Sequence, residues 1–394
     1  MDMDQLKQAF QEFMDQGEEP KSFFAPGRVN LIGEHTDYNG GNVFPCALSV
    51  GTYALARKRN DTKLRLYSLN FPDLGVIEAD LHQLKYDKSR DWANYPIGVT
   101  EVLQKEGFSL ETGFDVVYYG NIPNGAGLSS SASIEILTAV FLKSLFNLPV
   151  DMITMVQLAQ KAENEFVGVN CGIMDQFAIA AGKKDHAVIL DCDSLDYKHV
   201  PLKMSGLRLV IANTNKRRGL ADSKYNERRQ ECEKALSLLQ KEMDIQALGD
   251  VTNEQFEMHS HLIEDPVIRR RAKHAVYENN RTISAVDLLE KGDMKAFGQL
   301  MNESHISLRD DYEVTGTELD ALVEAAWREG AIGSRMTGAG FGGCTISIVK
   351  EDEIQAFTER VGKAYREVTD LEADFYTVEV GDGAKKMKEE EDIR

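Results

Sequence analysis

The chain has 394 residues, of which 42% are hydrophobic and 28% are charged, proportions typical of a globular protein with two packed domains. It carries 45 Lys and Arg against 64 Asp and Glu, a formal net charge of −19. A field of this sign repels nucleic acid phosphates and anionic membranes, so neither is expected as a partner. A polyanionic nucleotide would need local devices, such as backbone amides, a metal ion and a few placed cations.

The first twenty residues are acidic and amphipathic, without a basic start or an apolar run, so no secretory or mitochondrial leader is expected. No stretch approaches the ~18 uninterrupted apolar residues of a membrane helix. The five cysteines are widely scattered and form no CxxC pair. These features predict a protein of the reducing cytoplasm, without a disulfide framework or a zinc site.

Strand-like and helical segments are mixed along the chain without a strict βαβ rhythm, which favours an α+β fold. Runs rich in β-branched and aromatic residues predict strands at 114–119, 187–190, 207–212, 344–349 and 375–380. Apolar residues spaced three and four apart predict helices over 134–145 and 155–166, and an almost wholly helical stretch over 225–290. A polar segment at 191–206 separates two strand signals. It predicts two domains, residues 1–203 and 204–394.

A loop rich in glycine and serine, NIPNGAGLSSSAS at 121–133, lies between a predicted strand and a predicted helix. Glycines let the backbone approach a ligand closely, and the first amides of a helix are unpaired donors at its positive end. The loop therefore suits an anion, although an ordinary capped turn has the same composition. The P-loop motif GxxxxGK[ST] is excluded, because no lysine occurs between Gly120 and Leu142.

A second glycine cluster, RMTGAGFGGC at 335–344, contains the spacing GxGxxG at Gly338, Gly340 and Gly343. The dinucleotide-binding fingerprint requires a strand before this spacing and a helix after it. Here a segment of helical period precedes it and a predicted strand follows, so a Rossmann site is not expected. The backbone of this loop either lies against a ligand or simply makes a tight turn.

The run APGRVNLIGEHTDYNGG at 25–41 contains four ionisable side chains within ten residues: Arg28, Glu34, His35 and Asp37. Alone, such a cluster is most often a solvated polar loop. The His-x-Asp pair has no second histidine at ligand spacing, so zinc is not expected.

Together and in this order, the three loops resemble the three motifs of the GHMP kinases. PNGAGLSSSAS at 123–133 resembles the loop shared by the whole superfamily, whereas GRVNLIGEHTDYN and MTGAGFGGC resemble the motifs of its galactose-phosphorylating members. The resemblance implies a two-lobed α+β fold, with an N-terminal domain similar to domain 2 of ribosomal protein S5 and a ferredoxin-like C-terminal domain. It implies a kinase that transfers the γ-phosphoryl group of ATP to the 1-hydroxyl of galactose, the first committed step of galactose catabolism.

The resemblance also assigns roles to residues at the sugar side of the implied site. Asp175, in NCGIMDQ at 170–176, corresponds to the catalytic base, and Arg28 to the partner that keeps it charged and stabilises the transferring phosphoryl group. The implied sugar-binding residues are Glu34, His35, Thr36, Asp37 and Tyr225. Because a carboxylate accepts hydrogen bonds from two hydroxyls, we expect Asp37 to recognise the axial 4-hydroxyl.

The nucleotide and its metal ion are assigned in the same way. The implied ATP-binding residues are Gly125, Ala126, Gly127, Leu128, Ser129, Ser130, Ser131 and, outside the strong motifs, Ser68. Mg²⁺ is the implied cofactor, held by Ser131 and Glu163, because a hard cation takes hydroxyl, carboxylate and phosphate oxygens. The glycines at 338–343 are expected to shape the floor of the site.

Each of these residues also has a plain structural interpretation. Asp175 and Glu163 could be surface carboxylates, Arg28 a structural ion pair and Tyr225 a packing residue. Two rival functions stay open: an N-acetylgalactosamine kinase, and a regulatory relative that binds sugar and ATP but transfers nothing. The step Ser131-Ala132, together with Arg28 and Asp175, favours catalysis. We expect galactose and ATP as the partners of a monomer.

Overall fold

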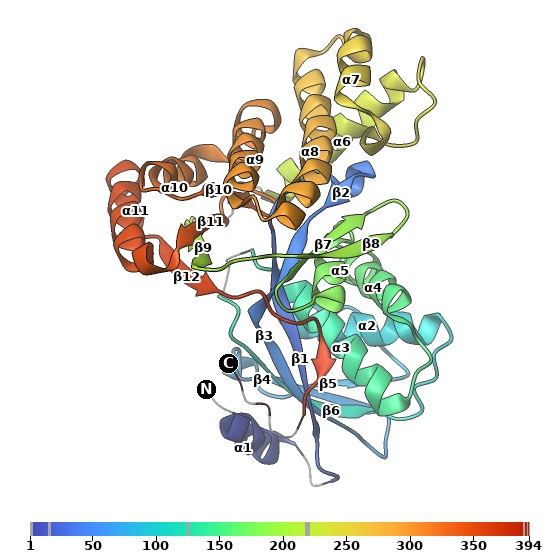
Figure 1. The fold of residues 1–394 in the computed structure, drawn as a ribbon. Coiled ribbons are helices and arrows are strands. Elements are labelled where there is room, and N and C mark those ends of the chain that lie inside the picture. Colours follow the sequence, from blue (N-terminus) through green and yellow to red (C-terminus); the bar gives the residue numbers. More distant parts are fainter. Residues whose placement is uncertain are drawn as a thin grey trace.

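The computed structural model describes residues 3–14, 17–123, 127–216, 221–388, 391 and 393, and two sheets organise them (Figure 1). The first sheet has six strands, in the spatial order β13 (Lys385–Lys386), β1 (Lys21–Asn30), β3 (Pro45–Lys58), β6 (Phe114–Gly120), β4 (Lys63–Ser68) and β5 (Ile77–Asp80). The second has four strands, in the order β10 (Gly333–Thr337), β11 (Cys344–Lys350), β9 (Leu207–Asn213) and β12 (Asp374–Val378). A small third sheet contains β2 (Asn42–Val43), β7 (His186–Asp191) and β8 (Tyr197–Pro201).

Helices cover both faces of the six-stranded sheet (Figure 1). On one side lie α2 (Asn94–Lys105), α3 (Ser130–Phe146), α4 (Met152–Lys161) and α5 (Met174–Ala181). On the other side lies α1 (Met3–Phe13). Successive residues of a strand point to opposite faces. Accordingly, Phe23 packs into the cluster under the four helices, whereas Phe24 packs into the cluster under α1.

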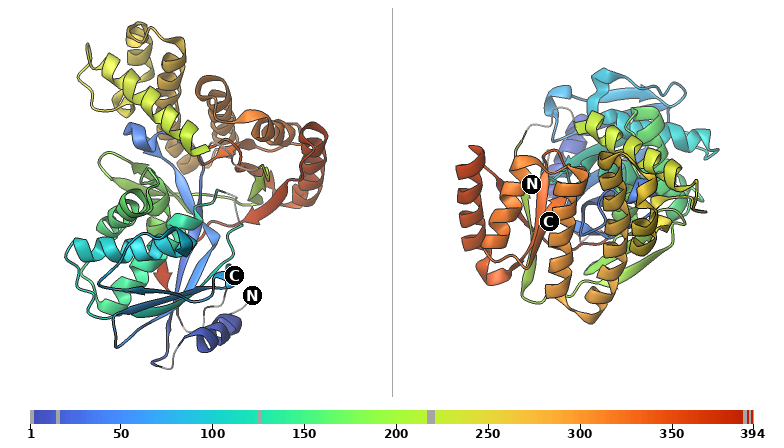
Figure 2. Two further views of the ribbon diagram at one scale, coloured as in Figure 1. Left: turned by 180° about the vertical axis from the view of Figure 1, so that it is seen from behind. Right: turned by 90° about the horizontal axis from the view of Figure 1, so that it is seen from above.

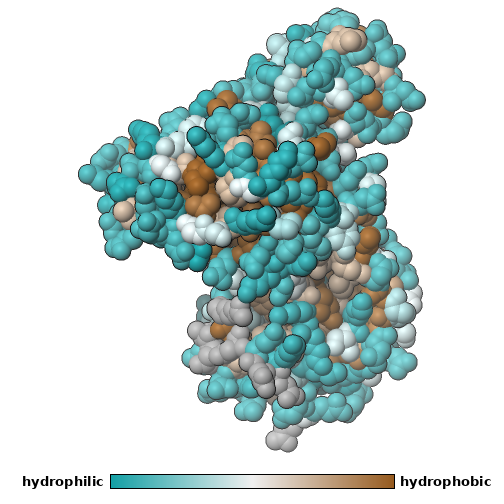
Figure 3. All heavy atoms as spheres, viewed as in Figure 1, coloured by the Kyte–Doolittle hydropathy of each residue, from teal (hydrophilic) through white to brown (hydrophobic). Residues whose placement is uncertain are grey.

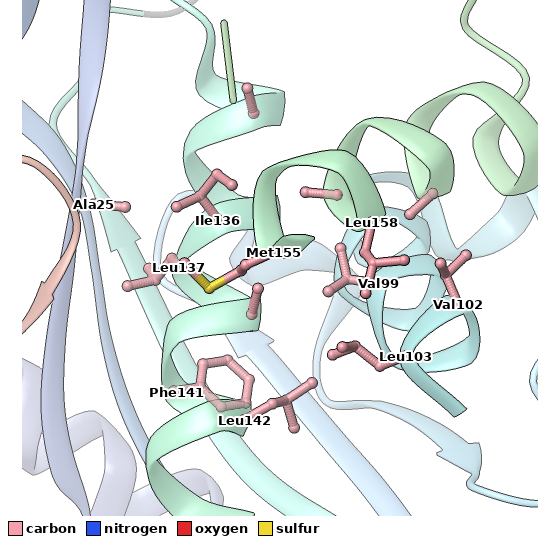
Figure 4. Close-up of a cluster of buried hydrophobic side chains, with 14 of the residues drawn as sticks. Ala25, Val99, Val102, Leu103, Ile136, Leu137, Phe141, Leu142, Met155 and Leu158 are labelled. Carbon is pink, nitrogen blue, oxygen red and sulfur yellow. The ribbon is translucent and has the colours of Figure 1, made fainter. Parts of the chain in front are cut away.

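The largest hydrophobic cluster lies between the six-stranded sheet and the helices α2 to α4. In Figure 4, Leu137 and Phe141 of α3, Met155 of α4 and Leu103 of α2 point into this cluster. Leu137 and Phe141 are fully buried. Their spacing of four residues places them on one face of α3, as the sequence period predicts.

The second lobe repeats this layered arrangement around the four-stranded sheet. The helices α10 (Gly316–Arg328) and α11 (Ile354–Thr369) pack on one face, where they meet Val210 of β9. Ile211, the next residue, points into a cluster that also contains residues of α9 (Met294–Ser307) and, from the first lobe, Phe44. Because this cluster is shared, the two lobes are joined by a continuous apolar interface. The predicted two-lobed α+β fold is confirmed.

A helical projection rises from the second lobe (Figure 2), with its own core of buried side chains. It contains α6 (Ala221–Leu239), α7 (Asn253–His259) and α8 (Pro266–Lys291). The stretch 225–290, predicted as almost wholly helical, consists mostly of these three helices, with two breaks between them. Capping explains both restarts: the Thr252 side chain accepts from the Gln255 amide, and the Asp265 side chain caps α8 one residue before Pro266.

Five predicted strands are present, although the last ends at Val378, two residues early: β6, β7, β9, β11 and β12. The two predicted helices are α3 and α4, and a π-helix over Ala162–Val167 continues α4. Sequence patterns missed β1 and β3, whose residues are mostly buried on both faces and so lack polar alternation.

The glycine run at 338–343 follows a strand that was not predicted. β10 separates this run from α10, which corrects the expectation that a helix directly precedes it. All five residues of β10 are buried, so its sequence shows no alternation. β10 pairs antiparallel with β11, and the glycine run connects the two strands. The Rossmann geometry is absent at this loop, because a strand and not a helix follows the glycines.

The division of the chain at 203/204 stays a prediction. The second sheet begins with β9 at Leu207, but the short β13 pairs with Phe23 and Phe24 of β1 in the first sheet. The face drawn in Figure 3 is mostly hydrophilic. Among the helices of the described residues, none has the length and apolar composition to span a membrane.

Truncating the core should measure what the cluster under α3 contributes. We expect Leu137→Ala to lower the free energy of unfolding by about 2–5 kcal/mol, because a buried cavity replaces the lost side chain. Val368→Ala, at an exposed position of α11, should change it by less than about 0.5 kcal/mol. Urea unfolding followed by circular dichroism checks both. Equal effects of the two substitutions would contradict the assigned core.

Candidate active site

A cavity of about 450 Å³ opens between the two lobes. It brings together residues from all three loops and from distant helices. The predicted site residues that line it are Arg28, Glu34, His35, Asp37, Gly127, Leu128, Ser129, Ser130, Ser131, Glu163, Asp175 and Tyr225. Gly338 and Ala339 of the third loop line it as well, as expected for a floor.

Four predicted residues are placed differently. Gly125 and Ala126 lie outside the described residues. Thr36 is fully buried and does not line the cavity; its hydroxyl lies 2.8 Å from the carbonyl oxygen of Gly33 and 2.6 Å from that of Asn42. Ser68 is buried at the end of β4, where its hydroxyl accepts from the Asn70 amide at 3.2 Å. The hydroxyl of Thr36 therefore shapes the loop and does not point into the cavity.

The ion pair between Arg28 and Asp175 lies in this cavity. The Arg28 Nε and Nη2 donate to the two Asp175 carboxylate oxygens at 2.6 and 2.8 Å, a bidentate geometry. A third donor, Nη1, binds the carbonyl oxygen of Gly127 at 2.9 Å. Burial alone would lower the pKa of Arg28, but Asp175 raises it above its ordinary value. The guanidinium thus stays a fixed cation at the wall of the cavity.

Ser129 also binds Asp175. Its hydroxyl donates to the Asp175 Oδ2, directly before α3 begins. Ser129 has a φ of 61°, an uncommon conformation for a residue other than glycine. Such strain persists where the surrounding structure imposes it, often at functional sites. Together, Arg28 and Ser129 fix the orientation of the carboxylate.

Glu34 links the first loop to the third across the lobe interface. Its Oε1 accepts from the Gly338 amide at 2.6 Å, and its Oε2 accepts from the Asn30 side-chain amide at 2.9 Å. The side chain is 2% exposed, so these contacts are made away from bulk water. The carboxylate is thereby held at the wall of the cavity by both lobes.

Aromatic rings surround His35. Its ring lies 5.6 Å from that of Tyr225 and 4.9 Å from that of Tyr312, centroid to centroid. The Nδ1 is 2.8 Å from the Tyr38 hydroxyl. Burial lowers the pKa of His35 to about 3. The imidazole is therefore neutral at physiological pH, and suits hydrogen bonding to a neutral ligand.

Asp37 occupies a space that only a glycine at position 172 leaves open. A Cβ atom on Gly172 would overlap the Asp37 Oδ2. Burial, and then the charge of Asp175, raises the pKa of Asp37 to about 7. Gly172 was not predicted as a site residue, although it lies in the same short run as Asp175. A glycine near a predicted catalytic residue is common in sequences, so the role of Gly172 could not be recognised without the structure.

A buried polar network holds Glu163. The residue sits on the π-helix that continues α4, a feature frequent at functional sites. The Gln176 amide donates to Glu163 at 2.6 Å and to Glu135 at 3.0 Å. The Ser131 hydroxyl also hydrogen-bonds Glu163, whose pKa is nevertheless raised by burial and by Asp175. Gln176 and Glu135 are further residues that sequence patterns missed.

The pair Ser131 and Glu163 fits a magnesium ion. Within the described residues, no group of three or more His, Cys, Asp and Glu side chains has the arrangement of a metal site. Mg²⁺ does not need one, because it is usually bound by one or two protein oxygens together with phosphates and water. A hydroxyl and a carboxylate side by side, next to the start of α3, supply such oxygens.

Known proteins resemble this chain in sequence and in fold. Residues 94–183 match the GHMP kinases N terminal domain, residues 285–367 match GHMP kinases C terminal, and residues 8–58 match the galactokinase galactose-binding signature. A galactokinase from Fusobacterium nucleatum subsp. nucleatum is 58% identical over 388 residues, covering 98% of this chain and all of that protein. This chain belongs to the galactokinases.

Further relatives agree with this assignment. A galactokinase from Bacillus subtilis is also 58% identical over 388 residues, with 98% and 100% of the two chains covered. The crystal structure of Lactococcus lactis galactokinase complexed with galactose matches with a TM-score of 0.95 at 49% identity, covering 98% and 100%. A mevalonate kinase from Methanococcus jannaschii, at 18% identity and TM-score 0.63 over 93% and 99%, shares the fold.

In this galactokinase, three kinds of group line the cavity: the start of a helix, a cation and a hydrogen-bond acceptor. The start of α3 presents Ser130 and Ser131 at the positive end of a helix dipole. Arg28 supplies a fixed cation, and Asp175 supplies an oriented hydrogen-bond acceptor. Phosphoryl transfer depends mainly on positioning and on neutralising charge, and this arrangement provides both.

A buried histidine of α8 also supports the first loop. The His274 Nε2 donates to the carbonyl oxygen of Glu34 at 3.1 Å, and its Nδ1 lies 2.9 Å from the Ser307 hydroxyl. The residue is fully buried, and burial lowers its pKa to about 4. The unfolded chain therefore binds a proton that the folded chain does not, between about pH 6.5 and pH 4.

Acidification should therefore weaken the fold through His274. As pH falls from 6.5 to 4, this residue should cost about 1.4 kcal/mol of unfolding free energy per pH unit. Urea unfolding at pH 6.5, 5.5 and 4.5 should show a shallower decline in His274→Gln. His261→Gln, at an exposed position, should keep the wild-type slope. Parallel slopes in all three proteins would disprove the buried neutral state.

Proposed function

We propose that this galactokinase transfers the γ-phosphoryl group of Mg-ATP to the 1-hydroxyl of D-galactose. The products are galactose 1-phosphate and ADP, and the reaction commits galactose to the Leloir pathway. The observation that supports it most directly is the bidentate pair of Arg28 and Asp175, set in one cavity between the serine loop and the sugar motif. A sugar kinase needs its acceptor side and its phosphate side in one space, and this cavity supplies both.

Asp175 is the proposed base and orienting group for the 1-hydroxyl of galactose. Its carboxylate accepts the hydroxyl proton as the oxygen attacks the γ-phosphorus and the bond to the β-phosphate oxygen breaks. The 1-hydroxyl is more acidic than an ordinary alcohol, and in a loose transition state its proton leaves late, so a strong base is unnecessary. Arg28 neutralises charge on the transferring group and holds the aspartate in position.

The sugar is proposed to lie against Glu34, His35, Asp37 and Tyr225. Glu34 and Asp37 accept hydroxyl hydrogen bonds, and the neutral His35 lies among tyrosine rings that suit the apolar face of a sugar. Asp37 recognises the axial 4-hydroxyl. Glucose, its 4-epimer, would leave this acceptor unpaired at a cost of about 1–3 kcal/mol, so it should react poorly.

The ATP phosphates are proposed to bind at the serine loop and the start of α3. Ser131 and Glu163 would hold Mg²⁺ there, and Gln176 keeps the Glu163 carboxylate in place. When bound, Mg²⁺ supplies positive charge that neutralises the phosphate oxygens. This local charge lets a protein with a net charge of −19 hold a polyanion.

We further propose a monomeric enzyme of the cytoplasm. All five cysteines are free, which suits a reducing compartment.

Release of ADP tests the function. With Mg-ATP, the wild type should turn over galactose and show little activity on glucose, N-acetylgalactosamine, mevalonate or homoserine. Asp175→Ala should lower kcat by about 10²–10⁴-fold, because it removes the proton acceptor. Asp287→Ala, at an exposed position of α8, is the matched control and should behave as wild type.

Three outcomes of this assay contradict parts of the proposal. Turnover of N-acetylgalactosamine in preference to galactose would indicate the rival kinase. Calorimetric binding of galactose and ATP without turnover would indicate a regulatory protein. Near wild-type kcat in Asp175→Ala would remove the base role from this residue.

Magnesium dependence tests Glu163 separately. Glu163→Gln should raise the Mg²⁺ concentration at half-maximal rate by about tenfold or more, because a neutral amide is a weaker ligand than a carboxylate. Titration calorimetry of Mg-ATP binding should show the same loss of affinity without turnover. Glu165→Gln, two residues along and exposed, should leave both values unchanged. A normal Mg²⁺ requirement in Glu163→Gln would exclude this ligand.

A further inference from the structure

Buried polar side chains of α8 contact the backbone of the first loop, the run at 25–41. His274, Glu278 and Thr282 follow one another at intervals of four residues, so they share one face of the helix. All three are fully buried. Within the described residues, none of the three lines the cavity. His274 and Glu278 hydrogen-bond the loop backbone, whereas the Thr282 hydroxyl donates to the carbonyl oxygen of Glu278 at 2.7 Å. The helix belongs to the second lobe, whereas the loop belongs to the first.

Glu278 makes the central contacts. Its Oε1 accepts from the Gly33 amide at 2.9 Å and from the Glu34 amide at 3.2 Å. The same oxygen accepts from the Ser304 hydroxyl at 2.6 Å, and Oε2 accepts from the Arg281 Nε at 2.9 Å. Two consecutive backbone amides of the sugar motif therefore end on one carboxylate, 244 and 245 residues away in sequence.

The charge of Glu278 is maintained by its surroundings. Burial alone would raise its pKa, but Arg281, His274 and Arg335 lower it to about 2. An ionised carboxylate binds amide donors about twice as strongly as a neutral oxygen does. The contact therefore persists over the whole pH range in which a kinase is assayed.

The first loop is also closely packed at Gly33 and at Asn42. Gly33 has a φ of 91°, and a Cβ there would lie 2.7 Å from the Asn42 carbonyl oxygen and 2.9 Å from the Thr282 hydroxyl. At the other end of the loop, the Asn42 amide donates to the Asn279 side chain at 2.7 Å. Because Glu34 directly follows Gly33 and the loop is held at Asn42, a shift of the Gly33 backbone would also move the Glu34 side chain.

We propose that Glu278 is a positioning residue of the sugar site. By binding the amides of Gly33 and Glu34 it sets the Glu34 carboxylate and the His35 ring against galactose. It thereby determines affinity and selectivity for the acceptor while leaving the nucleotide side unchanged. This role rests on the proposed function, because it assigns galactose to the space between Glu34 and Asp37.

Glu278→Gln tests the role with an isosteric change. The amide offers one oxygen, which can face either the loop amides or Arg281, but not both. We expect the KM for galactose to rise about 10- to 100-fold, since small misplacements at a reacting site have effects of this size. The KM for ATP should stay within about twofold, because the hydrogen bonds of Glu278 go to the sugar motif and to neighbouring side chains of the second lobe. Calorimetry without ATP should show the same weakening of galactose binding.

Two further variants separate positioning from stability. Asp115→Asn is the matched control, because Asp115 is also buried and paired with two arginines, at 2.8 and 2.7 Å, but lies in the first sheet. It should lower the melting temperature and leave the ratio of the two KM values at the wild-type level. Ser304→Ala removes one hydroxyl donor to Glu278 without disturbing the charge. It should raise the KM for galactose by a smaller factor, with the KM for ATP unchanged.

The outcomes distinguish this role from the proposed function. If the wild type itself fails to phosphorylate galactose, the proposed function is wrong and so is the assignment of Glu278. If the wild type is active, equal rises of both KM values in Glu278→Gln, or none, would overturn the positioning role alone. Should Glu278→Gln not fold, a wild-type ratio of KM values in Ser304→Ala would overturn it.

Discussion

The arrangement of this site depends on a guanidinium buried among carboxylates. Among the described residues that line the cavity, Arg28 is the one arginine or lysine, and it shares the space with Glu34, Asp37, Glu163 and Asp175. Burial, and then repulsion by the charge of Asp175, raises the pKa of Asp37 to about 7. Arg28 offsets the repulsion at one point, by its bidentate contact with Asp175. Mg²⁺, which we propose to bind here together with the phosphates, would add positive charge to the cavity.

Within the apolar interface between the lobes, two carboxylates bind backbone amides of the opposite lobe. Glu34 of the first lobe accepts from the Gly338 amide of the second, and Glu278 of the second accepts from two amides of the first. These hydrogen bonds are directional, since each backbone N–H points its single hydrogen at one acceptor. The apolar interface that surrounds them excludes water and strengthens each one. The sugar side of the cavity is thus fixed by both lobes together, whereas the serine loop belongs to the first lobe alone.

Sequence patterns predicted the fold class and most of the cavity lining, but not the residues that hold the lining in place. Arg28, Asp37 and Asp175 stand in dense, ordered motifs, and such motifs are readable because they are local. Gln176, Glu135 and Gly172 carry no comparable signal, since a glutamine or a glycine beside a motif is common. Among the strands that were missed, β1, β3 and β10 are mostly buried, and a strand buried on both faces has no polar alternation to detect. The partly exposed strands β5 and β8 were also missed, and each has only four or five residues.

The sequence by itself determined the local chemistry: the glycine and serine loop before α3, and the family to which the motifs belong. These features depend on residues that are close together in the sequence, so they can be recognised without the structure. The resemblance implied the partnership of Asp175 with Arg28, and the structure adds its bidentate geometry across 147 residues. Only the tertiary structure decided that Glu278 meets the loop at Gly33 across 245 residues. Such contacts arise from the packing of distant elements, and the geometry of that packing is not written in any single segment.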